Sequence, residues 1–188
     1  MTLLLIGLVL FLGAHSVQVF GASWRAAMIA RIGEGGWKGA YSLVSLAGLV
    51  LIVWGYGMAR HGEPLYALPP GLRHLTFALV WGGFIAIQAA YTPPNHIKAL
   101  LKHPMVFGVG LWALGHLLVR ATPAGLVLFG GFLAWAIVDY ISLRARGATP
   151  AGAPRWSNTL IAIAVGTVSG AIFVHVLHVW LIGVSPMG

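Results

Sequence analysis

The chain has 188 residues, of which 59% are hydrophobic and only 7% are charged. A soluble domain typically carries about 25% charged residues, so this composition excludes a soluble globule and indicates lipid as the solvent. The net charge is +8, but the basic residues stand singly or in pairs between apolar runs, which is typical of membrane orientation signals and not of a nucleic-acid patch. The absence of cysteine excludes disulfides, Fe–S clusters and covalent haem attachment through a Cys-x-x-Cys-His motif.

Six apolar runs approach the length of about 20 residues that a spanning helix needs. They lie at residues 2–21, 39–59, 71–91, 104–120, 124–144 and 157–183. The first run lacks the basic start of a signal peptide and is interpreted as a retained helix. The fourth is short and begins at His103-Pro104, and Ser157 is an expected N-cap for the sixth. The sequence therefore predicts an all-α fold, a polytopic transmembrane bundle of about six helices that forms one integral membrane domain over residues 1–188.

Lysine and arginine are divided unequally between the two ends of these spans. The loops after the first, third and fifth spans hold Arg25, Arg31, Lys38, Lys98, Lys102, Arg144, Arg146 and Arg155, whereas the other side holds Arg60, Arg73 and Arg120. By the positive-inside rule, the side with the larger number is cytoplasmic. We therefore expect a multi-pass protein of the bacterial inner (plasma) membrane with both termini in the periplasm. Small residues inside the spans, such as the GxxxG pair Gly166 and Gly170, predict close helix packing.

His61 is interpreted as a loop residue, and the other seven histidines are candidates for a functional site, because a polar side chain inside the bilayer is costly without a partner. Depth along the helices predicts a cytoplasmic-to-central cluster and a periplasmic cluster. The first contains His15 and His116, with His103 as a third candidate, and the second contains His74, His175 and His178. His175 and His178 are three residues apart, so they share one face of an α-helix.

Imidazole is a common ligand of haem iron, and two histidines on facing helices can hold a haem without any cysteine. Zinc is less favoured, because neither cluster has an obvious carboxylate or thiolate to complete a tetrahedron. Spacing alone leaves open which pair of histidines binds iron. It also leaves open that each histidine is only a hydrogen-bonded residue between helices.

Asp139 is the one acid inside a predicted span. The simplest interpretation is an ion pair with Arg144, Arg146 or a neighbouring helix. The alternatives are a partner that orients a ligand histidine, or a proton donor. The nearby loop 91–98, with Lys102 and His103, predicts a small basic lip that would bind lipid headgroups, haem propionates or a substrate phosphate.

Several motifs resemble the NnrU family of bacterial membrane proteins, which are associated with denitrification and nitric-oxide-responsive genes. They are Gly13-Ala-His15-Ser16, the run 39–46, Pro94-Asn95-His96-Ile-Lys98, His103-Pro104-Met105 and the run 129–135. The resemblance covers nearly the whole chain. It implies a membrane protein with a link to nitric oxide metabolism.

The family is similar in turn to 15-cis-zeta-carotene isomerase, a haem b membrane enzyme. The shared pattern stands here as His103-Pro104, Gly108, Trp112 and His116, with the early His15-Ser16. Carried over residue by residue, this resemblance implies haem b with His15 and His116 as its iron ligands. His103 and Asp139 are then expected beside the cofactor.

The expected function is a haem b membrane protein linked to denitrification or nitric oxide metabolism, with isomerase-like or redox activity. Its partners would be membrane lipid and a hydrophobic substrate or nitric oxide, and the sequence leaves its oligomeric state undefined. The alternative is a non-enzymatic accessory factor for the assembly or expression of a respiratory reductase. A small transporter is less favoured, because no inverted repeats or broken helices are evident.

Overall fold

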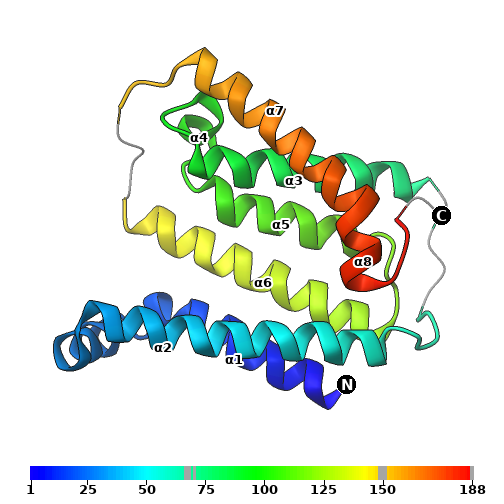
Figure 1. The fold of residues 1–188 in the computed structure, drawn as a ribbon, viewed down its shortest axis with the longest axis horizontal. Coiled ribbons are helices and arrows are strands. Elements are labelled where there is room, and N and C mark those ends of the chain that lie inside the picture. Colours follow the sequence, from blue (N-terminus) through cyan, green and yellow to red (C-terminus); the bar gives the residue numbers. More distant parts are fainter. Residues whose placement is uncertain (66–68, 70, 148–151, 187–188) are drawn as a thin grey trace. The chain divides into compact units, whose positions relative to one another are not determined.

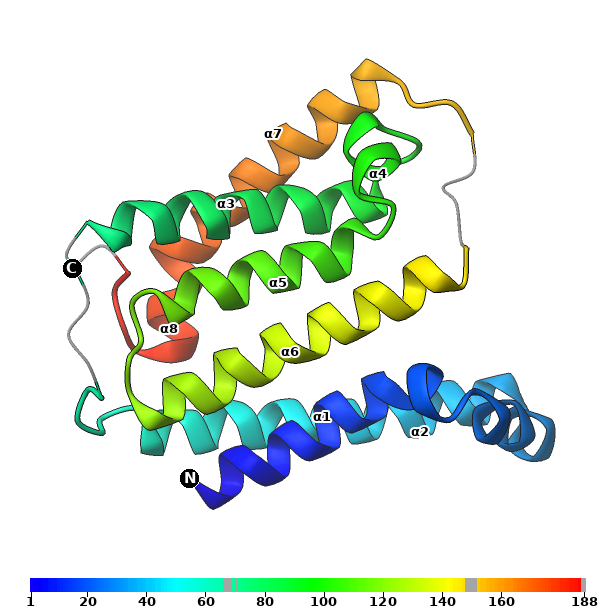
Figure 2. The ribbon, with the colours of Figure 1, turned by 180° about the vertical axis from the view of Figure 1, so that it is seen from behind.

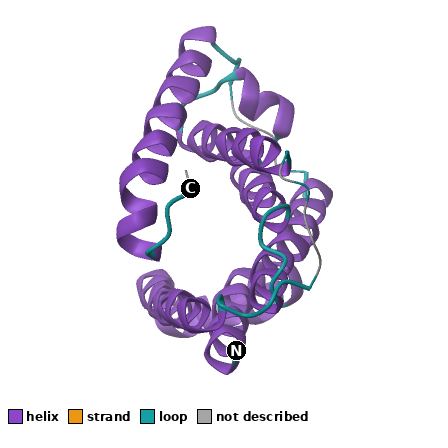
Figure 3. Ribbon diagram, turned by 90° about the vertical axis from the view of Figure 1, so that its right-hand side faces the viewer, coloured by secondary structure: helices purple, strands orange, loops and turns teal. Residues whose placement is uncertain are grey.

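A computed structural model describes residues 1–65, 69, 71–147 and 152–186. All of the regular structure in these residues is helical, as Figure 3 shows. The elements in chain order are α1 (Thr2–Phe20), α2 (Ala22–Ala59), α3 (Leu72–Tyr91), α4 (His96–Leu101), α5 (Pro104–Leu117), α6 (Pro123–Ala145), α7 (Trp156–Ile172), the π-helix η1 (Phe173–Leu177) and α8 (His178–Ile182). The predicted all-α fold is therefore confirmed.

Five helical stretches in the described residues are long and apolar enough to cross a membrane. They are α1, α2, α3, α6 and the continuous stretch Trp156–Ile182. The sixth predicted span is the shorter apolar helix α5, which has 14 residues. Many large apolar side chains on these helices are exposed, for example Val9, Leu43 and Leu160. Since water would oppose such a surface, the helices fit contact with lipid.

Residues 22–38 differ from the sequence prediction, which left them as a loop. They are helical and belong to α2. The run is rich in alanine, the best helix former, which favours a helix over a loop. The helix breaks only at Gly33, whose φ of 74° and ψ of 165° are readily adopted by glycine alone. Within this stretch, Lys38 pairs with Glu34 at 2.8 Å.

The chain divides into two compact units, described separately here. Unit 1 consists of Met1–Leu65 and Thr122–Gly131, and unit 2 consists of Tyr66–Ala121 and Phe132–Gly188. The single domain expected from the sequence stays a prediction.

In unit 1, α1 packs against α2 through glycines that let the two backbones meet. A Cβ atom at Gly7 would lie 2.6 Å from the backbone nitrogen of Ile52, and one at Gly48 would lie 2.7 Å from that of Phe11. Neither gap is wide enough for the methyl group of an alanine. The hairpin of α1 and α2 therefore depends on these small residues, as is common in membrane helix pairs.

In unit 2, α3 lies beside both α5 and α7, which Figures 1 and 2 show from opposite sides. Gly83 of α3 and Gly108 of α5 face each other, and a Cβ at Gly108 would lie 2.7 Å from the Gly83 carbonyl. Gly166 of α7 meets the backbone of Ile85, and Gly170 meets the ring of Phe84. The GxxxG pair thus packs closely against another helix, as the sequence predicts.

The connection between α3 and α5 docks onto the start of α7. Asn95 is 1% exposed and its side chain accepts from the Lys98 backbone, which caps α4. Thr159 of α7 receives a hydrogen bond from the His96 backbone at 3.0 Å, and its hydroxyl also lies 3.0 Å from the His96 ring. The Lys98 ammonium donates to the carbonyl of Thr92 at 2.7 Å. His96 and Lys98 of the predicted basic lip are half-buried, and their side chains make these contacts within the protein, while the lip itself stays a prediction.

Candidate functional site

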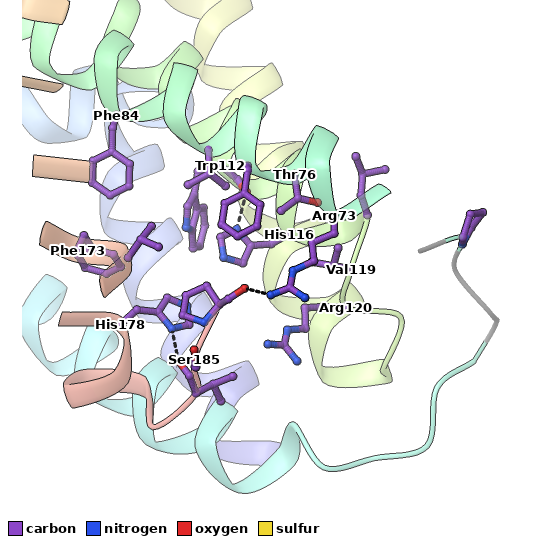
Figure 4. Close-up of a pocket in the computed structure, with 17 residues that line it drawn as sticks. Arg73, Thr76, Phe84, Trp112, His116, Val119, Arg120, Phe173, His178 and Ser185 are labelled. Carbon is purple, nitrogen blue, oxygen red and sulfur yellow. Dashed lines mark hydrogen bonds between the residues drawn. The ribbon is translucent and has the colours of Figure 1, made fainter. Parts of the chain in front are cut away.

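A cavity of unit 2 has a volume of about 630 Å³. It lies between one end of α3, the end of α5, the π-helix η1 with α8, and the segment 184–186 (Figure 4). Aromatic rings of Phe84, Trp112 and Phe173 form much of one side. A volume of this size is typical of small-molecule and cofactor sites, which range from about 300 to 1,000 Å³. We call it the His116 cavity.

His116 projects into this cavity from the last turn of α5. Its Nδ1 donates to the carbonyl of Trp112, 2.8 Å away and one helical turn earlier. This bond selects the neutral tautomer whose lone pair is on Nε2, the form that a metal ligand requires. The Thr76 hydroxyl donates to the Gly115 carbonyl at 2.9 Å and so ties α3 to α5 beside the histidine. The imidazole is therefore held in a defined orientation.

The π-helix η1 interrupts the last helix and sets which of its residues reach the cavity. Phe173 and His178 line the His116 cavity, whereas His175 lines a different hollow between α3 and α7. A π-helical turn inserts an extra residue, so the regular α-helical register does not continue through it, and such turns are frequent at functional sites. His175 and His178, which were expected to share one face, thus line different hollows.

The segment after α8 turns back to form a wall of the cavity. Gly183 ends α8 with φ of 70°, a left-handed conformation that glycine adopts without strain. The His178 Nδ1 then donates to the carbonyl of Val184 at 2.7 Å, and Arg73 donates to the carbonyl of Pro186 at 2.7 Å. Both contacts hold residues 184–186 against the cavity (Figure 4).

His15 lies in unit 1, on α1, where it lines a separate hollow of about 480 Å³ with Gln18, Trp37 and Tyr41. Its Nδ1 donates to the carbonyl of Phe11 at 2.7 Å, again one turn earlier along the helix. The ring also stacks on Phe11, with 4.2 Å between centroids. His15 and His116 thus share the same hydrogen-bonding arrangement, each within its own unit.

His103 lies just before α5 and follows a strained turn. Lys102 has φ of 63° and ψ of −50°, and the His103 backbone donates to the carbonyl of Leu101 at 2.7 Å across it. This is a γ-turn of the rare, strained kind. The Nε2 of His103 is buried and has no hydrogen-bond partner among the described residues. Burial lowers the pKa of this imidazole, and the charge of Arg144 lowers it further.

Asp139 forms an ion pair with Arg146, with 3.8 Å between Oδ1 and Nη2. The ion pair with Arg146 is one of the interpretations that the sequence analysis gave for Asp139. The Asp139 carboxylate also acts electrostatically on His103. The His103 ring contacts Tyr140, which follows Asp139 on α6. Asp139 and His103 are therefore neighbours, at the end of α5 opposite to His116.

The predicted grouping of the histidines is corrected in two respects. The helix α5 ends at Leu117, three residues earlier than predicted, so His116 lies in its last turn. His103 and His116 stand at opposite ends of α5, and His116 instead shares a cavity with His178 from the other expected cluster. Within the described part of the chain, no group of three or more His, Asp or Glu side chains is placed to hold a metal ion.

The cavity residues that sequence reasoning missed include the two arginines, Arg73 and Arg120. Both were interpreted only as charges that orient the chain in the membrane. A signal was present, because both stand at span ends on the side that carries few positive charges. The positive-inside rule alone gives little reason for arginine there.

Apolar helices of spanning length, with lipid-compatible outer faces and a histidine-bearing cavity, define a multi-pass helical membrane protein. The family model described as NnrU protein matches residues 3–186. The chain therefore belongs to the NnrU family, as its motifs predict. Neither the curated proteins nor the solved structures contain a match to it.

Proposed function

We propose that this NnrU-family chain is a haem b-binding integral membrane protein linked to denitrification, with His116 as an iron ligand. The observation that carries the proposal is the setting of His116. An imidazole oriented through Nδ1 projects into a cavity of about 630 Å³ whose walls are largely aromatic and aliphatic. Family membership supports the link to denitrification.

The residues of the cavity fit a haem. The tautomer of His116 has its lone pair on Nε2, and the rings of Phe84, Trp112 and Phe173 offer flat apolar surface to a macrocycle. The resemblance to the isomerase assigns His15 as the second ligand, and its matching bond to the Phe11 carbonyl supports the same tautomer. His178 is the second candidate for that role, because it lines the same cavity as His116.

A bound haem would supply a redox-active iron able to bind nitric oxide or a polyene double bond once one imidazole has moved away. The protein's own residues would orient the iron ligand. The Trp112 carbonyl and the Thr76 bridge fix the imidazole of His116, and the aromatic wall keeps water from one side of it. We place the protein in the bacterial inner membrane, with residues 147–155 in the cytoplasm and both termini in the periplasm, on the unequal distribution of Lys and Arg.

The test is an absorption spectrum of detergent-purified protein from haem-replete cells, oxidised and reduced. We expect a Soret band that shifts on reduction and that His116→Ala removes or weakens strongly. His74→Ala is the matched control, because His74 is exposed on α3 and does not line the cavity. Haem content per protein is measured for each variant.

His15→Ala and His178→Ala decide the second ligand, since only the residue that binds iron changes the low-spin spectrum when it is replaced. A colourless wild-type protein contradicts the proposal. If the colourless protein co-purifies with a respiratory reductase, and His15→Ala and His116→Ala leave that partnership intact, the accessory-factor function is supported instead.

A further inference from the structure

The described residues that line the His116 cavity include two arginines and no acidic side chain. Arg73 comes from the first turn of α3 and Arg120 from the residues just after α5, and both line the cavity. Figure 4 shows both side chains extending toward the segment that carries Ser185, away from the rings of Phe84 and Phe173. The cavity therefore has a cationic end and an aromatic end.

None of the three acidic residues of the chain lines this cavity. The sequence has only three, and Glu34 pairs with Lys38 at 2.8 Å while Asp139 pairs with Arg146 at 3.8 Å. The third, Glu63, is exposed in unit 1 and does not line the cavity. Within the described residues, neither Arg73 nor Arg120 forms an ion pair.

Arg73 is exposed and Arg120 is half-buried, and both border the apolar walls of the cavity, so their guanidinium groups are accessible to a ligand that enters it. Arg73 donates to the Pro186 carbonyl at 2.7 Å, but a guanidinium carries five donors, so most of its hydrogen-bonding capacity remains for such a ligand. Arginine also matches carboxylate geometry with two parallel hydrogen bonds.

We propose that Arg73 and Arg120 bind the two acidic groups of a dianionic amphiphile whose apolar body lies against Phe84, Trp112 and Phe173. This inference rests on the proposed function, under which the amphiphile is haem b and the acidic groups are its propionates. The cationic end then fixes which edge of the macrocycle faces residues 184–186. An acidic group on an apolar body is also available from an anionic lipid or a fatty acid, although each of these carries one such group and not two, so the experiment separates these sources.

The test uses metal-free protoporphyrin IX and its dimethyl ester, so that affinity does not depend on iron ligation. Binding to the purified full-length protein in a neutral detergent is followed by porphyrin fluorescence and by quenching of tryptophan. We expect the diacid to bind at least about tenfold more tightly than the ester, since the ester loses the charge-assisted hydrogen bonds between carboxylate and guanidinium. Arg73→Gln and Arg120→Gln should each lower the affinity for the diacid by a similar factor and leave that for the ester unchanged.

The controls keep a folding defect apart from a binding defect. Arg73→Lys and Arg120→Lys retain the charge and should restore much of the preference for the diacid. Arg155→Gln removes an exposed arginine of unit 2 that does not line the cavity, and it should change nothing. Thermal unfolding and gel filtration of every variant check that the fold persists.

Equal affinity of the wild type for diacid and ester overturns the inference, as does a preference that survives in the Arg73→Gln, Arg120→Gln double variant. Competition with oleate and with vesicles containing phosphatidylglycerol identifies a lipid occupant. If oleate or the lipid binds in an arginine-dependent way while the porphyrins do not, the haem assignment is wrong. If His116→Ala loses the Soret band but keeps the preference for the diacid, iron ligation and binding by the arginines are separate properties. Either proposal can therefore be overturned without the other.

Discussion

At the residue scale, the turn before α5 shows what a spacing pattern leaves out. The motif His103-Pro104 predicts the start of a helix, and α5 does begin at Pro104. The positive φ of Lys102 had no signal in the sequence, because lysine has no preference for that conformation. Such strain persists only where the surroundings enforce it, and here Leu101 also accepts a hydrogen bond from the Tyr140 hydroxyl at 2.8 Å.

We expect Lys102→Gly to stabilise the protein by about 1 kcal/mol, because glycine adopts a positive φ without the clash that a Cβ causes. The measurement is the midpoint of thermal unfolding in detergent. Lys102→Ala is the control, since it removes the same side chain and keeps the Cβ. A glycine variant that is no more stable than the alanine variant contradicts strain at this residue.

The candidate site also depends on local geometry that a spacing pattern does not predict. The resemblance selected His15 and His116, and both prove to have Nδ1 bonded to the carbonyl one turn earlier, which no spacing rule predicts. The position of His178 depended on a π-helical turn, and a single extra residue in a helical turn leaves no trace in an apolar run.

At the element scale, helix pairing rests on glycines whose roles differ although the sequence presents them alike. Gly48 and Gly57 both lie on α2, yet a Cβ at Gly48 meets the backbone of α1 at 2.7 Å, and one at Gly57 meets nothing within 4 Å. Both positions are helical, so alanine should gain intrinsic helix propensity at each. Only the tertiary contact decides the sign of the effect.

Gly48→Ala should therefore destabilise the α1–α2 hairpin by about 1–3 kcal/mol, the usual cost of overpacking. Gly57→Ala should be neutral or should stabilise by up to about 1 kcal/mol. Chemical or thermal unfolding of the two variants, compared with wild type, measures both. Equal effects of the two substitutions would show that α1 and α2 do not meet at Gly48.

At the scale of the whole molecule, composition and run length predicted the architecture well. Each of the six apolar runs contains a helix, because only helices satisfy backbone polar groups in lipid without a barrel. The residues between runs were harder to predict. The stretch 22–38 is helical although it carries three basic residues, because hydropathy reports where lipid lies and says little about backbone conformation outside it.

The unequal distribution of basic residues makes a further prediction for the whole chain. Alkaline phosphatase, which needs the oxidising periplasm for its disulfides, should be inactive when fused after Gly147 and active when fused after Gly62. Both residues lie in described loops between apolar helices. Enzyme activity in intact cells, normalised to the amount of fusion protein, measures the result. Activity after Gly147 and none after Gly62 would contradict the proposed orientation.

The wall formed by residues 184–186 has a consequence for biogenesis. Residues on α3 and α5 that line the His116 cavity are synthesised long before Val184, Ser185 and Pro186. The bonds from His178 and Arg73 to this segment cannot form until translation has passed residue 186. A ligand that enters the cavity during translation therefore meets a site without this wall, and the wall is added afterwards, so release of the ligand should be slower from the finished protein than from the nascent chain.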